Sequence, residues 1–270
     1  MLVMGMPGNT PVVFLHGFMG APSDWLPVIK VLSQRYYCIC PDLPGHGMSI
    51  NTTAGLSPVR QIELLVDSIA ANVSGSVHIV GYSLGGRIAM IIADKWPSLL
   101  RSLTLESAHT GLQSELAREQ RKLADECWAR DFNHVALPVV LEKWFSQAVY
   151  QSLSGDAKSC VIKAIIERAT EMDNRISSHD SRLMFHRRMA DALIAFSLSK
   201  QMDFSARLMN SAIPVFYISG ELDKKYCELG EQLSEGSCSV QHHVFKQCGH
   251  NVHQQQPEAF AQLLASQLPF

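Results

Sequence analysis

A nucleophilic serine is indicated by the pentapeptide Gly81-Tyr-Ser83-Leu-Gly85, which has the pattern G-x-S-x-G. The apolar run Val77–Val80 precedes it, and an apolar-periodic segment, Leu84–Ala93, follows it. This order predicts a strand, a tight turn and a helix, an arrangement that exposes a serine hydroxyl while glycines let neighbouring backbone pass close by. Ser83 would then lie at a helix N-terminus, where free N–H groups favour developing negative charge. The alternative is an ordinary serine–glycine turn before a helix.

Residues that would activate Ser83 occur later in the chain. A serine nucleophile needs a base, and the base needs an orienting acid. In this arrangement the three residues occur along the chain in the order serine, acid, histidine. Glu221 and Asp223 directly follow a strand-like run, and we favour Asp223, whose alternative role is to cap a helix or form a turn. His250 follows the last such run and a glycine, in a loop position typical of catalytic groups, and His253 is its competitor. The predicted triad is therefore Ser83, Asp223 and His250.

Two backbone N–H groups are predicted to stabilise an oxyanion. In this arrangement one N–H comes from just after the first strand and the other from the residue after the nucleophile, which nominates Phe18 and Leu84. His16, two residues before Phe18, is expected to shape the loop rather than to titrate in the reaction. No H-E-x-x-H motif or cysteine–histidine cluster with metal-ligand spacing occurs in the sequence, so no metal site is expected.

The elements that must hold these residues alternate between strands and helices. Short apolar runs rich in β-branched and aromatic residues predict strands, and the amphipathic segments between them predict helices. The predicted strands are Pro11–Leu15, Tyr36–Cys40, Val77–Val80, Leu103–Leu105, Ile213–Ile218 and Val240–Phe245, and the predicted helices are Asp24–Gln34, Val59–Val73, Leu84–Lys95 and Glu258–Leu268. This alternation predicts an α/β fold with a mostly parallel sheet flanked by helices.

A change of pattern separates the middle of the chain from the rest. Between residues 112 and 207, strand-like runs are missing from the sequence and helical periodicity dominates. We therefore predict a core made of residues 1–111 and 208–270, interrupted by a helical insertion at 112–207.

Composition excludes several classes of function. The 270 residues are 47% hydrophobic and 18% charged, which is typical of a globular domain and not of a disordered chain. A net charge of -2 gives no reason to expect nucleic acid as a partner, and no apolar run is long enough to insert into a membrane. The sequence shows no secretory leader, and its odd number of cysteines, seven with no CxxC pair, favours reduced thiols. We expect a cytoplasmic protein, and a monomer, although the sequence leaves the oligomeric state open.

Four motifs together resemble the α/β-hydrolase superfamily. They are His16-Gly17-Phe18, Asp42-Leu-Pro-Gly45-His46-Gly47, Gly81-Tyr-Ser83-Leu-Gly-Gly86 and Gly249-His250, and they extend over most of the chain. The resemblance implies that the helical insertion is a cap over the active site, with the loop that begins at Asp42 shaping the entrance.

A narrower resemblance concerns one family within that superfamily. Gly81–Arg87, His109-Thr-Gly-Leu-Gln113 with the arginines that follow it, and Gly249-His250-Asn-Val-His253 are similar to the MenH family, the 2-succinyl-6-hydroxy-2,4-cyclohexadiene-1-carboxylate synthases of menaquinone biosynthesis. Thr110 departs from the pattern, because relatives have proline there. The resemblance implies a lyase that eliminates pyruvate from an enolpyruvyl cyclohexene dicarboxylic acid. Its triad starts a proton abstraction, and neither an acyl-enzyme nor a cofactor is needed.

Arg87 gives a physical reason to expect an acidic substrate. It lies four residues after Ser83, one helical turn away on the same face. A guanidinium there could hold a carboxylate through two parallel hydrogen bonds, a group for which an esterase of neutral esters has no obvious use. The alternative is an arginine paired with a nearby acid at the start of the helix.

Further substrate-binding residues are implied by the resemblance alone. These are Arg121, Arg168, Tyr82 and Trp144, which together with Arg87 would surround a small polycarboxylate. Each has a plain structural alternative: a solvated helix face for Arg121 and for its neighbour Arg118, and core packing for Tyr82 and Trp144. The residues around Arg168 match the family only loosely.

Two other functions stay open at this point. A serine hydrolase, a carboxylesterase or thioesterase for a small acidic ester, would use the same triad, so only the pocket distinguishes it from a lyase. A ligand-binding receptor built on a hydrolase scaffold would keep the fold without using the triad.

Overall fold

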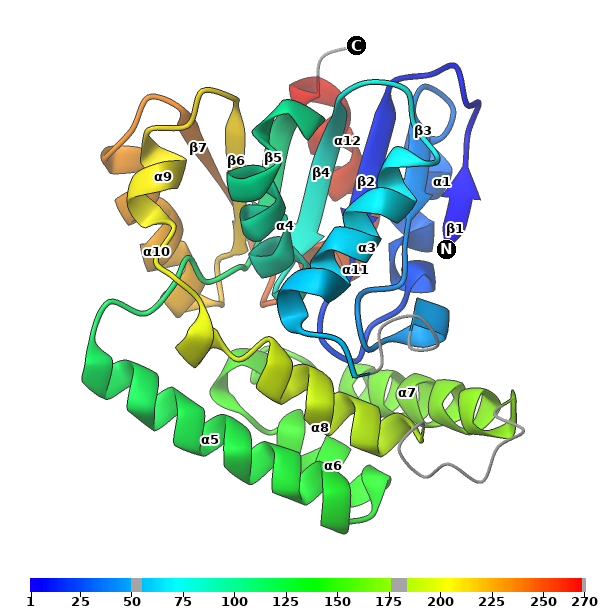
Figure 1. Ribbon diagram of the computed structural model, residues 1–270. Coiled ribbons are helices and arrows are strands. Elements are labelled where there is room, and N and C mark those ends of the chain that lie inside the picture. The colour runs from blue at the N-terminus through cyan, green and yellow to red at the C-terminus, as the bar shows by residue number, and fades with distance from the viewer. Residues whose placement is uncertain (50–54, 176–183, 269–270) are drawn as a thin grey trace.

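A computed structural model describes residues 1–49, 55–175 and 184–268 of the chain. Within these ranges the strands form one sheet in the order β1-β3-β2-β4-β5-β6-β7 (Figure 1). The strands are β1 (Leu2–Met4), β2 (Pro11–Leu15), β3 (Tyr37–Cys40), β4 (Val77–Tyr82), β5 (Leu100–Glu106), β6 (Val215–Gly220) and β7 (Val240–Phe245). All neighbouring strands are parallel except β1, which pairs with β3 in the antiparallel sense. The predicted α/β fold with a mostly parallel sheet is confirmed.

Helices cover both faces of the sheet because its strands are apolar on both sides. In β2, Val13 and Leu15 join one buried cluster with α3 (Pro58–Ala70) and α4 (Leu84–Lys95), whereas Val12 and Phe14 join another. Successive side chains of a strand point to opposite faces, so a continuous apolar run produces two cores. The second cluster is completed by α1 (Leu26–Leu32) and α12 (Pro257–Gln267), which contact each other.

Of the remaining core helices, one precedes β6 and the other two follow β6 and β7. They are α9 (Ser205–Met209), α10 (Lys224–Glu235) and α11 (Val252–Gln255). The helix α10 begins immediately after Asp223, and α11 begins two residues after His250, so both start at loops that carry predicted triad residues. None of the helices in the described ranges has the length and apolar character needed to cross a bilayer.

Within the described residues, four α-helices lie wholly in the segment predicted as an insertion. They are α5 (Glu115–His134), α6 (Leu137–Trp144), α7 (Gly155–Arg175) and α8 (Phe185–Ala195). In Figure 1 they lie together beyond the end of the sheet toward which β4 points. Their apolar faces form a third buried cluster, around Phe132, Leu141 and Met189, which also takes in Met19 from the core. The boundaries drawn at residues 112 and 207, and the function of this segment as a cap, stay predictions.

Candidate active site

Ser83 lies on the turn between β4 and α4. Its backbone has φ 49° and ψ -107°, a conformation that costs a non-glycine residue about 1–3 kcal/mol and occurs mainly at functional sites. The glycines around it leave room for crossing backbone. A Cβ on Gly85 would lie 2.2 Å from the Leu15 carbonyl oxygen, and one on Gly81 would lie 2.6 Å from the Gly85 carbonyl oxygen. The G-x-S-x-G pattern is therefore a steric requirement of this turn.

The structure brings Ser83, His250 and Asp223 together. His250 Nε2 lies 3.3 Å from Ser83 Oγ, and His250 Nδ1 lies 2.6 Å from Asp223 Oδ2. Both His250 and Asp223 are buried. With Nδ1–H donating to the carboxylate, Nε2 is left as the acceptor for the serine proton. The other candidate acid, Glu221, instead accepts a hydrogen bond from the backbone N–H of Gln247.

His253, the competing base, is placed differently. Its ring is buried, and its Nδ1 lies 2.7 Å from an oxygen of Glu106 at the end of β5. It does not line the cavity that contains Ser83. The structure therefore separates two histidines that the sequence left as alternatives.

The turn after β2 carries the first predicted oxyanion donor, Phe18. Its neighbours' amides are already used: Met19 N–H donates to His46 Nε2 at 3.1 Å, and Gly20 N–H donates to the Gly17 carbonyl at 3.0 Å. Among the described residues, Phe18 N–H has no protein acceptor. The second donor, Leu84, is the first residue of α4, and the amides of a first helical turn lack intrahelical partners. Both residues line the Ser83 cavity.

Two neutral histidines hold this turn in place. Burial lowers the pKa of His16 and of His46 from 6.5 to about 3, so both are uncharged at neutral pH. His16 Nε2 accepts the Leu43 N–H at 3.1 Å, which ties the end of β2 to the loop after β3. His46 Nε2 accepts the Met19 N–H in the same way, and the His46 ring packs against the Phe18 ring. The expectation that His16 shapes a loop fits these contacts, and His46 is a second such residue that the sequence did not single out.

A cavity of about 80 Å³ opens onto Ser83 between the sheet and the helices α5, α6 and α8. Its lining includes Arg87, Arg121, Tyr82 and Trp144. Aromatic rings also surround the base. The rings of Tyr226, Tyr82 and Tyr150 lie 4.9, 5.4 and 5.8 Å from that of His250. Burial raises the pKa of Tyr226 to about 12, so its hydroxyl stays protonated. The catalytic histidine candidate is therefore surrounded by aromatic rings.

Arg87 brings a positive charge to this cavity without a matching acid. Its Nε donates to Gln201 Oε1 at 2.6 Å, and its Nη2 donates to the Phe196 carbonyl at 2.5 Å. Both acceptors are neutral, and among the described residues Arg87 forms no ion pair. Burial, with a smaller contribution from Arg121, lowers the pKa of Arg87 to about 10, which still leaves it charged at neutral pH. The guanidinium is therefore held in place but not neutralised.

Comparisons with known proteins identify the family of the chain. Residues 12–263 match the alpha/beta hydrolase family. Two 2-succinyl-6-hydroxy-2,4-cyclohexadiene-1-carboxylate synthases, from Salmonella newport and Salmonella typhimurium, are each 34% identical to the chain. Each alignment covers 97% of this chain and 94% of the relative. The chain belongs to the MenH family of α/β-hydrolases.

Solved structures with the same fold include other activities. MenH from S. aureus superposes with a TM-score of 0.79 at 22% identity, covering 98% of this chain and 96% of that one. An N-acyl homoserine lactone degrading enzyme superposes with a TM-score of 0.70 at 19% identity, covering 98% and 95%. At these identities the likeness shows the fold alone. Membership of the MenH family rests on the sequence relatives, and the contacts of individual residues come from this chain.

The MenH-type arginines fall in different surroundings. Arg121 lines the Ser83 cavity, where its Nε donates to both oxygens of Asp125 at 2.9 and 3.0 Å. Asp125 is buried and also accepts the Ser197 hydroxyl. Arg118, its neighbour along α5, donates to the carbonyls of Ser199 and Gln201 and so anchors that segment. Among the described residues, Nε is the Arg121 nitrogen that donates hydrogen bonds, and both go to Asp125.

Arg168 is not brought into the cavity of Ser83. It lines a neighbouring cavity of about 280 Å³, donates to the Met19 carbonyl and forms an ion pair with Asp24 at 3.1 Å. The two cavities share Phe18, Tyr82 and Tyr150 as lining residues. The proposed role of Arg168 in substrate binding stays a prediction, and it requires a connection between the cavities.

Tyr82 and Trp144 combine packing with a place at the cavity. The Tyr82 hydroxyl donates to Asn251 Oδ1, next to His250, and its ring lies between the rings of His250 and His253. Trp144 packs its ring 5.0 Å from that of Phe18, and its Nε1 donates to the Tyr150 hydroxyl at 3.3 Å. The packing alternative and the substrate role are thus compatible for both residues.

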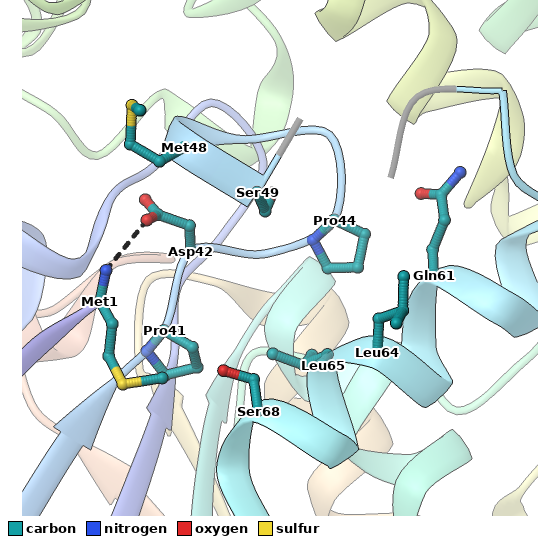
Figure 2. Close-up of a pocket in the computed structure, with 10 residues that line it drawn as sticks. All are labelled: Met1, Pro41, Asp42, Pro44, Met48, Ser49, Gln61, Leu64, Leu65 and Ser68. Carbon is teal, nitrogen blue, oxygen red and sulfur yellow. Dashed lines mark hydrogen bonds and ion pairs between the residues drawn. The ribbon is translucent and has the colours of Figure 1, made fainter. Parts of the chain in front are cut away.

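Asp42 lies away from the Ser83 cavity, in a pocket that Pro44, Met48 and Ser49 of the same loop also line. Figure 2 shows its carboxylate beside the N-terminal amine of Met1, at a separation of 3.1 Å, in a pocket of about 210 Å³ against α3. That pocket shares no lining residue with the Ser83 cavity. The loop reaches the active site through His46 and not through Asp42.

Sequence reasoning missed the residues that hold the functional side chains. Gln201 accepts from Arg87 and donates to the carbonyls of His109 and Thr110, which joins α4 to the segment after β5. Nothing in the sequence marks this glutamine. Glu106 did leave a signal, because an acid directly ends the predicted strand Leu103–Leu105.

Proposed function

We propose that the protein is a lyase that eliminates pyruvate from 2-succinyl-5-enolpyruvyl-6-hydroxy-3-cyclohexene-1-carboxylate, giving 2-succinyl-6-hydroxy-2,4-cyclohexadiene-1-carboxylate in menaquinone biosynthesis. One observation carries the proposal: the charged Arg87, held only by neutral acceptors, lies in the same cavity as Ser83. A buried cation without a counter-ion favours an anionic ligand. The named activity of the curated relatives, whose substrate carries several carboxylates, supports the same conclusion.

The proposed reaction begins at the Ser83–His250 contact. His250 takes the hydroxyl proton of Ser83, and Asp223 stabilises the imidazolium that forms. The serine oxygen removes the proton from the ring carbon that bears the succinyl group. That C–H bond is acidified by the adjacent carbonyl, so Ser83 acts as a base and forms no covalent bond to the substrate.

Electron flow through the ring then expels the enolpyruvyl group. The C–H electron pair forms a ring double bond, the existing double bond moves by one position, and the C–O bond to enolpyruvate breaks. The proton held by His250 passes to the departing group, which becomes pyruvate, so the enzyme returns to its starting state. Negative charge on the succinyl carbonyl oxygen during this step would be stabilised by the Phe18 and Leu84 amides.

Orientation of the carboxylates supplies the remaining catalysis in this proposal. Arg87 and Arg121 would each hold one carboxylate, and their fixed positions would align the C–H bond with Ser83. The substrate is larger than a cavity of 80 Å³, so we propose that it also extends into the adjacent cavity when Tyr150 moves. That movement would bring a third carboxylate within reach of Arg168. Tyr82 and Trp144 would contact the ring.

The test is pyruvate release from substrate generated in situ by the preceding enzyme, followed with a lactate dehydrogenase assay. We expect rapid release by the wild type and a loss of about 10³-fold or more in Ser83→Ala. The control is Ser102→Ala, which removes another buried serine hydroxyl, on β5. A wild-type rate no faster than the spontaneous reaction would refute the proposal.

The alternative is a hydrolase of a small acidic ester or thioester. The specific observation in its favour is that the triad and the oxyanion turn would serve acyl transfer equally well. A hydrolase passes through an acyl-enzyme, whereas the proposed lyase does not. An acyl adduct on Ser83 in a mass spectrum during turnover of an acidic ester would therefore favour the alternative, as would failure to release pyruvate.

A further inference from the structure

Glu106 and His253 form a second buried pair of a carboxylate and a histidine. The Glu106 side chain is completely buried at the end of β5. Its two oxygens lie 2.9 and 2.7 Å from His253 Nδ1, and Oε1 also accepts the backbone N–H of His253 at 3.0 Å. A carboxylate without access to water is costly to bury unless it is fully hydrogen-bonded, and these contacts meet that need. Such a pair fixes both of its partners firmly.

Glu106 is also bonded directly to the nucleophile turn. It lies opposite Tyr82 in the parallel register of β4 and β5, and its carbonyl accepts the Ser83 N–H at 2.9 Å. The backbone of Glu106 therefore holds the nucleophile, while its side chain holds the loop that carries the base. One residue connects two segments that are far apart in the sequence.

The His253 ring anchors the loop that carries His250 through two aromatic contacts. The ring stacks on Trp25, with centroids 4.1 Å apart, and lies 4.9 Å from the Tyr82 ring. The Tyr82 hydroxyl donates to Asn251 in the same loop. The loop between His250 and His253 is therefore held at His253 by Glu106 and at Asn251 by the residue that precedes Ser83.

We propose that Glu106 and His253 are positioning residues that set the separation between Ser83 Oγ and His250 Nε2. The inference rests on the proposed catalytic function of the triad, but not on which substrate the triad uses. Neither residue lines the Ser83 cavity, so their effect passes through the position of His250. The Ser83–His250 separation of 3.3 Å is at the long end of hydrogen bonding, where a further displacement breaks the contact. A misplacement of about 1 Å costs up to roughly 100-fold in rate.

The experiment measures Ser83 activation without reference to the natural substrate. Diisopropyl fluorophosphate phosphorylates an activated serine, and intact-protein mass spectrometry gives the rate constant. The variants are His253→Leu, His253→Asn and Glu106→Gln. Leucine removes the side-chain N–H that donates to Glu106, whereas asparagine places a side-chain N–H close to the position of Nδ1. Glutamine keeps an oxygen for the His253 backbone N–H but loses the carboxylate.

A matched control comes from the same two strands. His78 on β4 and Ser102 on β5 are register partners and form a buried side-chain contact of 2.7 Å, like the Glu106–His253 pair but away from Ser83. Ser102→Ala therefore removes a buried polar contact without touching the nucleophile or the loop of the base. Thermal unfolding of every variant separates loss of stability from loss of alignment.

We expect roughly tenfold slower labelling in His253→Leu, a smaller loss in Glu106→Gln, and recovery of most of the rate in His253→Asn. In the pyruvate assay kcat should fall in parallel while KM stays within about twofold, because no substrate contact is removed. Ser102→Ala should lower the unfolding temperature and label at the wild-type rate.

Wild-type labelling by Glu106→Gln or His253→Leu would overturn the proposal, as would an equal loss in Ser102→Ala. If His253→Leu fails to fold, the labelling rates of Glu106→Gln and His253→Asn decide the question. The proposal expects His253→Asn to be labelled faster than Glu106→Gln. A wild type that is labelled but releases no pyruvate would refute the proposed function and leave this test intact.

Discussion

Two histidines three residues apart, His250 just before α11 and His253 within it, are each paired with a buried carboxylate. His250 Nδ1 lies 2.6 Å from Asp223, and His253 Nδ1 lies 2.7 Å from Glu106. The two pairs differ at the rest of the ring. His250 presents Nε2 to Ser83 Oγ, which lines a cavity, whereas the His253 ring is stacked on an indole.

This difference shows what makes a histidine a base. A carboxylate on Nδ1 fixes the tautomer in both pairs, so it cannot by itself identify the catalytic residue. What distinguishes His250 is that its other nitrogen contacts Ser83, a nucleophile that lines a cavity. His253 is also paired with a carboxylate, but its ring is stacked on Trp25. The Glu106–His253 contact can therefore only hold the loop.

The largest effect is expected from the same chemical change made in both pairs. Asp223→Asn should reduce pyruvate release by about 10³-fold, because the amide favours the wrong tautomer of His250. Glu106→Gln should cost no more than about tenfold, because it disturbs only position. Steady-state kinetics on both variants measure the ratio, and equal losses would remove the distinction between the two pairs.

The double variant Asp223→Asn/Glu106→Gln shows whether the pairs act through one another. If Glu106 works only by aligning His250, its loss should matter little once His250 is already inactive as a base, so the two effects should not add. Fully additive losses would mean that Glu106 influences the reaction by a separate route.

A second prediction concerns the positive charge of Arg87, which lines the same cavity as Ser83. Arg87→Ala should lower kcat/KM for the enolpyruvyl substrate by roughly 100-fold, since a charge-assisted bidentate contact is lost near the reacting carbon. The rate of Ser83 labelling by diisopropyl fluorophosphate, which is neutral, should stay within about threefold of the wild type. The control is Arg207→Ala, which removes an arginine paired with Asp94 on the outside of the core. An unchanged kcat/KM would remove the main support for a polycarboxylate substrate.

The sequence was sufficient for the sheet and for the order of the triad because both are local patterns. Each predicted run became a strand, although β5 begins at Leu100, before the predicted Leu103. The strand β1 was missed because its apolar run, Leu2–Met4, is only three residues long, which is too short to indicate a strand by itself. The serine turn was recognisable because its glycines are sterically required.

Contacts between distant segments could not be predicted in the same way. Glu106 and His253 are 147 residues apart and Arg87 and Gln201 are 114 apart, and no local period connects either pair. The Asp24 carboxylate, 144 residues from Arg168, likewise gave no sign that it would pair with that arginine. Such pairs depend on how loops at the end of the sheet meet, which the pattern of a single segment does not encode.

The smallest predicted effect concerns His46, whose hydrogen-bond partners among the described residues are backbone groups and not a carboxylate. His46 is hydrogen-bonded to the Pro44 carbonyl and to the Met19 amide, and burial lowers its pKa from 6.5 to about 3. The unfolded chain therefore binds a proton between these pH values that the folded chain does not, so stability is lost as the pH falls through this range. At pH 5 the loss from His46 alone should be roughly 2 kcal/mol. Denaturant unfolding at pH 7.5 and pH 5 should show a smaller drop for His46→Asn than for the wild type, while His134→Asn, at an exposed histidine, should behave like the wild type. An identical drop in all three proteins would show that His46 is not a neutral buried group.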